Sequence, residues 1–278
     1  MTTTSSTRRI THRSAGHGQG ITRLMSPGDL GERLKPFVFL DHFETDGRGM
    51  AKLPWHPHSG IATHTTLLGG EVTYEDSTGK SGSLSTGNVE YMQAGEAVWH
   101  TGGLRPGRAV RGFQLWLALP DEDEMAPAQS HYVDAVDVPT DGRVRVLLGT
   151  YEGMASPLSY RAPLTYLHVR LSEGDGWRYQ PASDHDVAWL AVSEGALSVN
   201  EVTTGRELLV FEDGNGAIDV VAATDVEFVI GSAARHPTPL VLGHYSVHSS
   251  RDRLRRGIDG IRELRATLTT TDAVVDYP

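Results

Sequence analysis

The chain contains no cysteine among its 278 residues. This absence excludes disulfide bridges, thiolate metal sites, iron–sulfur clusters and cysteine nucleophiles. The sequence also has no apolar run that approaches the length of a membrane span. The first residues, Met1–Ser6, lack the apolar core of a signal peptide. We therefore expect a cytoplasmic protein that does not enter a membrane.

Positive charge is scarce. The 25 lysines and arginines stand against 35 aspartates and glutamates, which gives a net charge of −10 at pH 7. A chain of this charge has no bulk attraction to nucleic acid, so we expect no direct nucleic-acid partner. The most notable arginine cluster lies near the C-terminus, at 251–265, and we interpret it as the solvated face of a helix.

Helical periodicity is confined to that C-terminal stretch. Leu254, Ile258, Ile261 and Leu264 recur at steps of three and four residues, which predicts an amphipathic helix. Either of the two serines at 249 and 250 can cap its start. We therefore predict one C-terminal helix.

The rest of the chain reads as short β-strands separated by glycine-containing turns. The predicted strands are 21–24, 36–43, 63–68, 71–75, 81–84, 89–92, 97–100, 111–119, 144–148, 164–171, 187–192, 197–199, 207–211 and 226–230. Short strands at this spacing are typical of all-β barrels and sandwiches. The order of elements in 67–87 recurs in 191–214, which suggests two copies of one β-domain. We expect 129–140 to be the connector between them.

The stretch Trp55-His56-Pro57-His58-Ser59-Gly60 carries the clearest chemical signal. Pro57 favours an extended backbone at His56. In an extended segment the side chains of His56 and His58 point to the same side, and imidazole is the commonest metal ligand. His100 follows a predicted strand about forty residues later, and a β-barrel can bring it to the same end. Three histidines arranged in this way predict an open metal site.

These segments together resemble the pirin family. The resemblance rests on WHPHSG, LLGGEVTYEDSTGKSGSLSTGNVEYMQAG, the histidine at position 100 and GFQLWLALP. It implies an all-β fold of two tandem cupin (jelly-roll-like) β-barrels with a C-terminal α-helix. It also implies an N-terminal pirin cupin domain, 1–135, with the metal site, and a C-terminal cupin domain, 136–278, without one.

Pirins bind iron through both histidines of an HPH motif and through the histidine and glutamate of an HSE motif. The resemblance therefore implies His56, His58 and His100 as metal ligands and Fe(2+) as the cofactor, although imidazole also accepts other divalent metals. The glutamate falls on Gly102, because this chain reads HTG. A second carboxylate of the family pattern is replaced by Ala62.

His64 is our candidate for a compensating residue. It shares a strand face with Ala62, so it can act as a fourth ligand or a base if that face points into the barrel. The alternative is a core histidine satisfied by backbone or water. Glu90 and Glu96 are further carboxylates near the site, and we expect Glu96 to be exposed.

The resemblance implies a dioxygenase that uses Fe(II) and acts on a flavonol (quercetin-like) or another small organic substrate. The alternative is a non-catalytic regulatory pirin that binds a protein partner, which the lost carboxylates favour. The third hypothesis is a purely structural bicupin. It would have to bury three converging imidazoles without metal or water, which costs free energy.

In the second domain the nearest cluster of possible ligands is Asp184-His185-Asp186. We interpret it as a polar loop and predict no metal there.

Overall fold

The computed structural model describes residues 7–48, 52–105 and 107–277. The Thr- and Ser-rich start of the chain, 1–6, lies outside the described residues. The chain forms two compact units, each built from two segments. Unit 1 combines Met1–His17 with Val136–Arg235, and unit 2 combines Gly18–Ala135 with His236–Pro278. The division into 1–135 and 136–278 stays a prediction about domains, whereas compactness groups the C-terminal segment with the first barrel.

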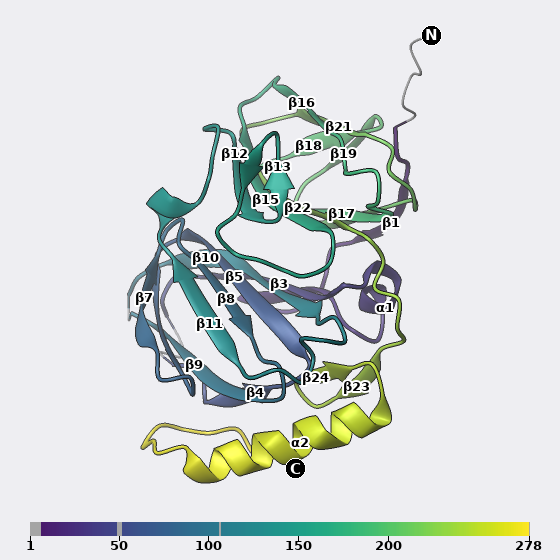
Figure 1. Cartoon of the computed structure of the whole chain (residues 1–278). Helices are drawn as coiled ribbons and strands as arrows, with labels where there is room; N and C mark the ends of the chain where they lie inside the picture. The colour runs from purple at the N-terminus through teal and green to yellow at the C-terminus, as the bar shows by residue number, and fades with distance from the viewer. Residues whose placement is uncertain (1–6, 49–51, 106, 278) are drawn as a thin grey trace. The chain divides into compact units, whose positions relative to one another are not determined.

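Unit 2 consists mainly of two antiparallel sheets that face each other (Figure 1). The six-stranded sheet has the order β11 (Gln129–Val133), β8 (Val89–Gln93), β5 (Ile61–Gly69), β10 (Val110–Ala118), β3 (Phe37–Thr45) and β2 (Ile21–Met25). The four-stranded sheet has the order β4 (His56–His58), β9 (Val98–Leu104), β6 (Glu71–Asp76) and β7 (Ser81–Ser85). Leu67 of β5 and Leu84 of β7 meet in the apolar core between the sheets, because side chains alternate between the two faces of each strand.

The C-terminal segment of unit 2 forms a hairpin and a long helix. The hairpin pairs β23 (Val241–Gly243) with β24 (Ser246–His248), and helix α2 spans Arg251–Thr267. Ser250 caps α2 by accepting a hydrogen bond from the Arg253 amide. Figure 1 shows α2 running beside β9 and the hairpin. Unit 2 also contains the short helix α1 (Leu30–Leu34).

Unit 1 repeats the arrangement of two sheets. Its six-stranded sheet has the order β1 (Ile10–Ser14), β20 (Leu208–Phe211), β17 (Val187–Glu194), β22 (Val226–Ala233), β15 (Leu164–Leu171) and β12 (Val144–Leu148). Its four-stranded sheet has the order β16 (Gly176–Tyr179), β21 (Ile218–Ala222), β18 (Leu197–Val199) and β19 (Val202–Thr204), and β13 (Thr150–Tyr151) pairs with β14 (Met154–Ala155). Trp177 and Phe228 lie in its apolar core.

The predicted all-β architecture with a C-terminal helix is confirmed. One local expectation was wrong, because the first part of the expected connector is strand β11. Ser130 Oγ and Tyr132 Oη each donate a hydrogen bond of 2.7 Å to Asp76 Oδ2. Strand β11 therefore belongs to the barrel, where it is an edge strand of the six-stranded sheet. Among the described residues, no helix combines the length and the apolar character needed to cross a membrane.

Candidate metal centre

Three histidines converge at one end of the barrel of unit 2. His56 and His58 lie on β4, and His100 on the neighbouring strand β9 pairs directly with His56. One ring nitrogen from each histidine lies within 4.8 Å of the other two. The Nε2 atoms of His58 and His100 are 3.1 Å apart. The structure therefore brings together the three histidines that the sequence singled out.

Main-chain carbonyls fix the direction of two of the rings. His56 Nδ1 donates to Pro54 O at 2.9 Å, and His58 Nδ1 donates to Tyr245 O at 3.1 Å. A carbonyl oxygen only accepts hydrogen bonds, so Nδ1 carries the hydrogen in both rings. Nε2 then carries the lone pair that faces the other histidines. This arrangement is the one that metal-binding histidines use.

Burial keeps the three imidazoles neutral. Burial, with a smaller contribution from the neighbouring His56, lowers the pKa of His58 to about 3. Burial also lowers the pKa of His56, and it holds the pKa of His100 well below the ordinary value of 6.5. Near pH 7 all three rings are therefore free of the second proton that would block metal binding.

The spacing of the nitrogen atoms fits one divalent ion. Metal–imidazole bonds of about 2.0–2.1 Å at right angles place two nitrogens roughly 3 Å apart, close to the 3.1 Å between His58 and His100. Three ligands on one side leave the remaining positions open for water or substrate. The three-histidine site is compatible with a divalent metal.

Position 102 contributes no ligand. Gly102 lies two residues beyond His100 on β9, so both positions share a strand face. The nearest atom to a Cβ added at Gly102 is the Thr73 carbonyl oxygen at 3.5 Å, which is ordinary contact. The carboxylate is therefore missing, although a side chain could start at this position without a clash at Cβ.

Glu90 on β8 is the carboxylate that lies beside the histidines. Its Oε1 is 4.0 Å from His100 Nδ1, its side chain is 6% exposed, and Thr65 Oγ1 donates to its Oε2. Burial raises the pKa of Glu90 to about 7; the Thr65 hydrogen bond opposes this and the charge of Asp76 adds to it. A carboxyl with a pKa near 7 is suited to proton transfer.

The structure does not bring His64 to the other histidines. His64 and Thr65 are consecutive on β5 and face opposite sides of the sheet, and Thr65 faces Glu90. The His64 ring is buried, its Nδ1 lies 3.2 Å from Thr66 Oγ1, and its ring centre lies 6.4 Å from that of Tyr91. A catalytic role for His64 stays a prediction without geometric support. The sequence alone did not decide which face of the strand His64 lies on, because a shift of the strand register by one residue exchanges the two faces.

Two aromatic residues near the histidines were not singled out from the sequence. The Trp116 ring centre is 4.8 Å from that of His58, and the Tyr245 ring centre is 5.8 Å from that of His56. The sequence predicted Trp116 only as part of the strand 111–119. Tyr245 is 187 positions from His58, and its backbone φ of 58° is unusual for a residue other than glycine, so no local signal marked it.

Glu96, the second carboxylate considered from the sequence, points away from the site. Its side chain is 47% exposed and lies 3.7 Å from Arg256 of α2.

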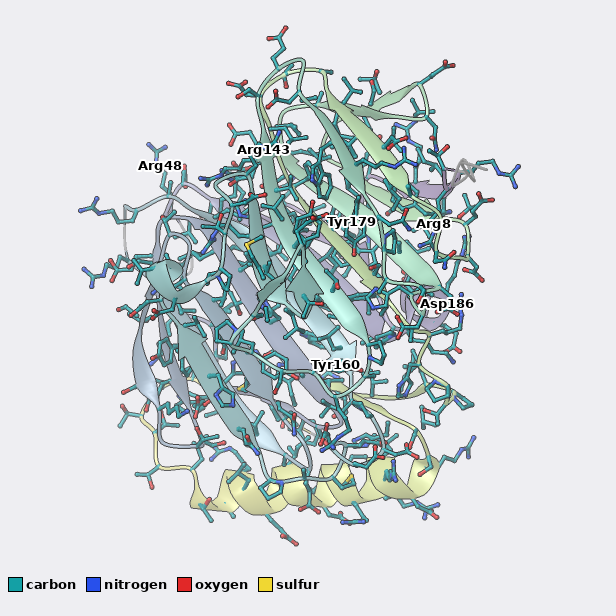
Figure 2. The ribbon with its side chains drawn as sticks, turned by 45° about the horizontal axis from the view of Figure 1, so that its top comes forward. Arg8, Arg48, Arg143, Tyr160, Tyr179 and Asp186 are labelled. Atoms are coloured by element: carbon teal, nitrogen blue, oxygen red, sulfur yellow. The ribbon has the colours of Figure 1, made fainter. Side chains whose placement is uncertain are left out.

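In unit 1 the cluster at 184–186 is part of a hydrogen-bonded loop. His185 Nδ1 lies 2.7 Å from Ser232 Oγ, and Arg8 Nη2 donates to the Asp186 carbonyl at 2.7 Å (Figure 2). Among the described residues, the histidines of unit 2 are the one group of three or more residues placed to hold a metal ion. The absence of metal from the second barrel stays a prediction.

Comparison with known proteins identifies the family. The family model described as Pirin matches residues 19–117. A "Pirin-like protein" of Solanum lycopersicum is 31% identical over 219 residues, covering 75% of this chain and 74% of the relative. The chain belongs to the pirin family. A Pseudomonas aeruginosa protein that carries the name "Putative quercetin 2,3-dioxygenase" is 31% identical over 270 residues, covering 90% of this pirin and 93% of the relative.

Solved structures share the fold of this pirin. Quercetin 2,3-dioxygenase from Acinetobacter baumannii superposes with a TM-score of 0.84 at 24% identity, covering 94% of this chain and 98% of that one. A bacterial pirin from Escherichia coli in complex with nickel(II) superposes with a TM-score of 0.65 at 17% identity, covering 82% and 98%. The expected tandem cupin fold is confirmed.

Proposed function

We propose that this pirin is an Fe(II)-dependent dioxygenase that acts on a flavonol (quercetin-like) or another small organic substrate. The observation that carries the proposal is the convergence of three histidines, one buried and two half-buried, whose pKa values are all lowered. The names of two similar proteins refer to quercetin 2,3-dioxygenase, and a pirin of the same fold was solved with nickel(II). These names support the reaction class.

His56, His58 and His100 would hold the iron through Nε2. Bound there, Fe(II) supplies Lewis acidity and electron transfer to oxygen, which side chains cannot supply. The protein keeps the His58 ring turned toward the site through the Tyr245 carbonyl. The aromatic rings of Trp116 and Tyr245 flank the histidines, and they give this end of the barrel the apolar character that suits an aromatic substrate.

Glu90 is the proposed base of the reaction. Quercetin-like substrates carry acidic hydroxyl groups, and a carboxylate beside the metal ligands can take such a proton. Thr65 Oγ1 lies between Glu90 Oε2 and Gln114 Oε1, 2.8 Å from the latter. When Glu90 takes up the proton, it can donate to Thr65 Oγ1, and the single hydroxyl hydrogen of Thr65 can then turn to Gln114 Oε1. This exchange of partners stabilises the protonated form of Glu90.

Oxygen uptake tests this proposal. Wild-type protein reconstituted anaerobically with Fe(II) is mixed with quercetin in aerated buffer, and oxygen consumption is recorded. We expect uptake that is lost in His58→Ala. Uptake no higher than the His58→Ala background would overturn the dioxygenase assignment for flavonols.

The regulatory alternative is favoured by one observation, the absence of a carboxylate at Gly102. It predicts that wild type binds metal but consumes no oxygen with any flavonol. A metal-loaded protein that captures a protein partner, and loses it in His58→Ala, would support this function instead.

A further inference from the structure

The C-terminal segment of unit 2 holds the residues next to the ligand histidines. Trp55, which precedes His56, donates its amide to Ala273 O at 2.8 Å and accepts from the Val275 amide at 2.9 Å. The amide and the carbonyl of Trp55 are thus both hydrogen-bonded to residues more than 200 positions away. The backbone that carries His56 is fixed from outside the metal-binding strand.

The residue before His100 is held in the same way. The Trp99 indole donates to the Ile261 carbonyl of α2 at 3.0 Å. Trp99 and Ile261 are fully buried and pack with Trp55 in one apolar cluster. Helix α2 therefore covers the outer side of the strands that carry the ligands.

Ser59, which follows His58, is the start of a buried chain of hydrogen bonds. Its Oγ is 2.9 Å from His248 Nε2, and His248 Nδ1 is 2.7 Å from Glu124 Oε1. The exposed fractions of Ser59, His248 and Glu124 are 0%, 2% and 1%. Ser59 Oγ also donates to the Glu96 carbonyl. A hydrolytic triad needs an accessible hydroxyl, so this chain, which we call the Ser59 relay, has a different role.

The far end of the Ser59 relay is anchored to the start of α2. Glu124 accepts hydrogen bonds from the Ser249 amide at 2.9 Å, from Ser249 Oγ at 2.7 Å and from Arg253 Nη1 at 2.6 Å. Its two oxygens are therefore fully used. An added Cβ at Gly257 of α2 would lie 2.2 Å from Ser59 Oγ. The glycine that weakens the helix is thus required by its close approach to the relay.

The relay and the metal centre meet in the β23–β24 hairpin. The turn of this hairpin presents the Tyr245 carbonyl to His58 Nδ1, and the hairpin ends at His248. The Val247 amide also donates to the Ser59 carbonyl at 3.3 Å. Holding His248 therefore holds the carbonyl that orients the His58 ring.

We propose that Ser59, His248 and Glu124 are positioning residues of the metal centre. They fix the hairpin against the segment after His58, so that the Tyr245 carbonyl keeps His58 Nε2 turned toward His56 and His100. This inference rests on the proposed metal-binding function. It adds Glu124 and His248, which lie 24 or more positions from any ligand histidine, and Ser59, which follows His58.

The positioning role is tested by measuring both the Fe(II) affinity and the thermal stability of variants. Fe(II) affinity is determined anaerobically by competition with a chelator for wild type, Ser59→Ala and Ser232→Ala, and the metal-free proteins are melted in parallel. Ser232 is the matched control, because it is a buried serine bonded to a histidine, His185, but belongs to unit 1. We expect Ser59→Ala to bind Fe(II) about 10-fold more weakly and Ser232→Ala to bind it like wild type.

The outcomes separate this inference from the proposed function. If wild type and Ser59→Ala bind Fe(II) equally, the positioning role fails while the metal site stands. If wild type itself binds no Fe(II), both fail. If Ser59→Ala does not fold, His248→Gln replaces it, with the same expected loss; wild-type affinity in His248→Gln would overturn the inference.

Discussion

At the scale of single residues, the metal centre depends on which way each donor points. The HPH spacing and the strand before His100 were enough to predict the three histidines. The strand alternation that separates His64 from Thr65 was not available from the sequence, because either face of a strand can be the inner one. Glu90 was noted only as a nearby carboxylate, and its place beside His100 depends on the pairing of β5 with β8.

Restoring a carboxylate at position 102 is expected to strengthen metal binding. Gly102→Glu places its side chain on the same strand face as His100, where the backbone leaves room. We expect at least about 10-fold tighter Fe(II) binding, on the order of 1.4 kcal/mol, measured by chelator competition. Gly102→Gln is the control of the same shape, and equal affinity of the two variants would contradict a ligand role.

Glu90 is expected to set the pH dependence of oxygen uptake. Its pKa is about 7 in the metal-free protein, and the positive charge of Fe(II) held by the histidines would lower it. The rate with quercetin should therefore rise with pH in wild type, with a midpoint below about 7. Glu90→Gln should lower the rate roughly 10²-fold or more and lose this rise. A variant that keeps both the rate and the rise would show that Glu90 is not the base.

At the scale of elements, the sequence predicted most strands and α2, but it did not predict which elements contact one another. Strand β11 was predicted to be a connector because its inward-facing side chains, the buried Ser130 and the half-buried Tyr132, carry hydroxyl groups, which both donate to Asp76. The hairpin that contacts His58 was not predicted to be near it, because contacts across nearly 190 positions leave no local pattern. Gly257 lowers the helix propensity of α2, but a Cβ at this position would clash with Ser59 Oγ.

The attachment of α2 through Glu124 is expected to weaken in acid. Burial raises the pKa of Glu124, but hydrogen bonds from His248, Ser249 and Arg253 outweigh it and lower the pKa to about 2 from an ordinary 4.5. The unfolded chain therefore takes up this proton first as pH falls. The ionised Glu124 carboxylate therefore stabilises the folded chain by about 3 kcal/mol above pH 4.5, and this contribution is lost as pH falls toward 2.

Chemical denaturation of wild type and Glu124→Gln measures this effect. The difference in free energy of unfolding should be largest above about pH 5 and should shrink as pH is lowered. Glu263→Gln, on the exposed face of α2, is the control and should differ little from wild type at any pH. A difference for Glu124→Gln that does not change with pH would contradict the account of its carboxylate.

At the scale of the whole molecule, the tandem cupin fold followed from the strand pattern and the family resemblance. The make-up of the two compact units did not follow from the sequence, because no sequence pattern shows that the C-terminal segment packs with the first barrel.

Among the described residues, one group of three histidines is placed to hold a metal ion. We therefore expect one metal ion per chain. His185→Ala in unit 1 should leave the metal content unchanged by elemental analysis, and two ions per chain would contradict this expectation.

The metal content of the reconstituted protein tests the central claim most directly. Wild type and His58→Ala are loaded anaerobically with Fe(II), passed through a desalting column and analysed for iron by mass spectrometry. The account predicts close to one iron per chain in wild type and almost none in His58→Ala. Wild-type protein that retains no more iron than His58→Ala would contradict it.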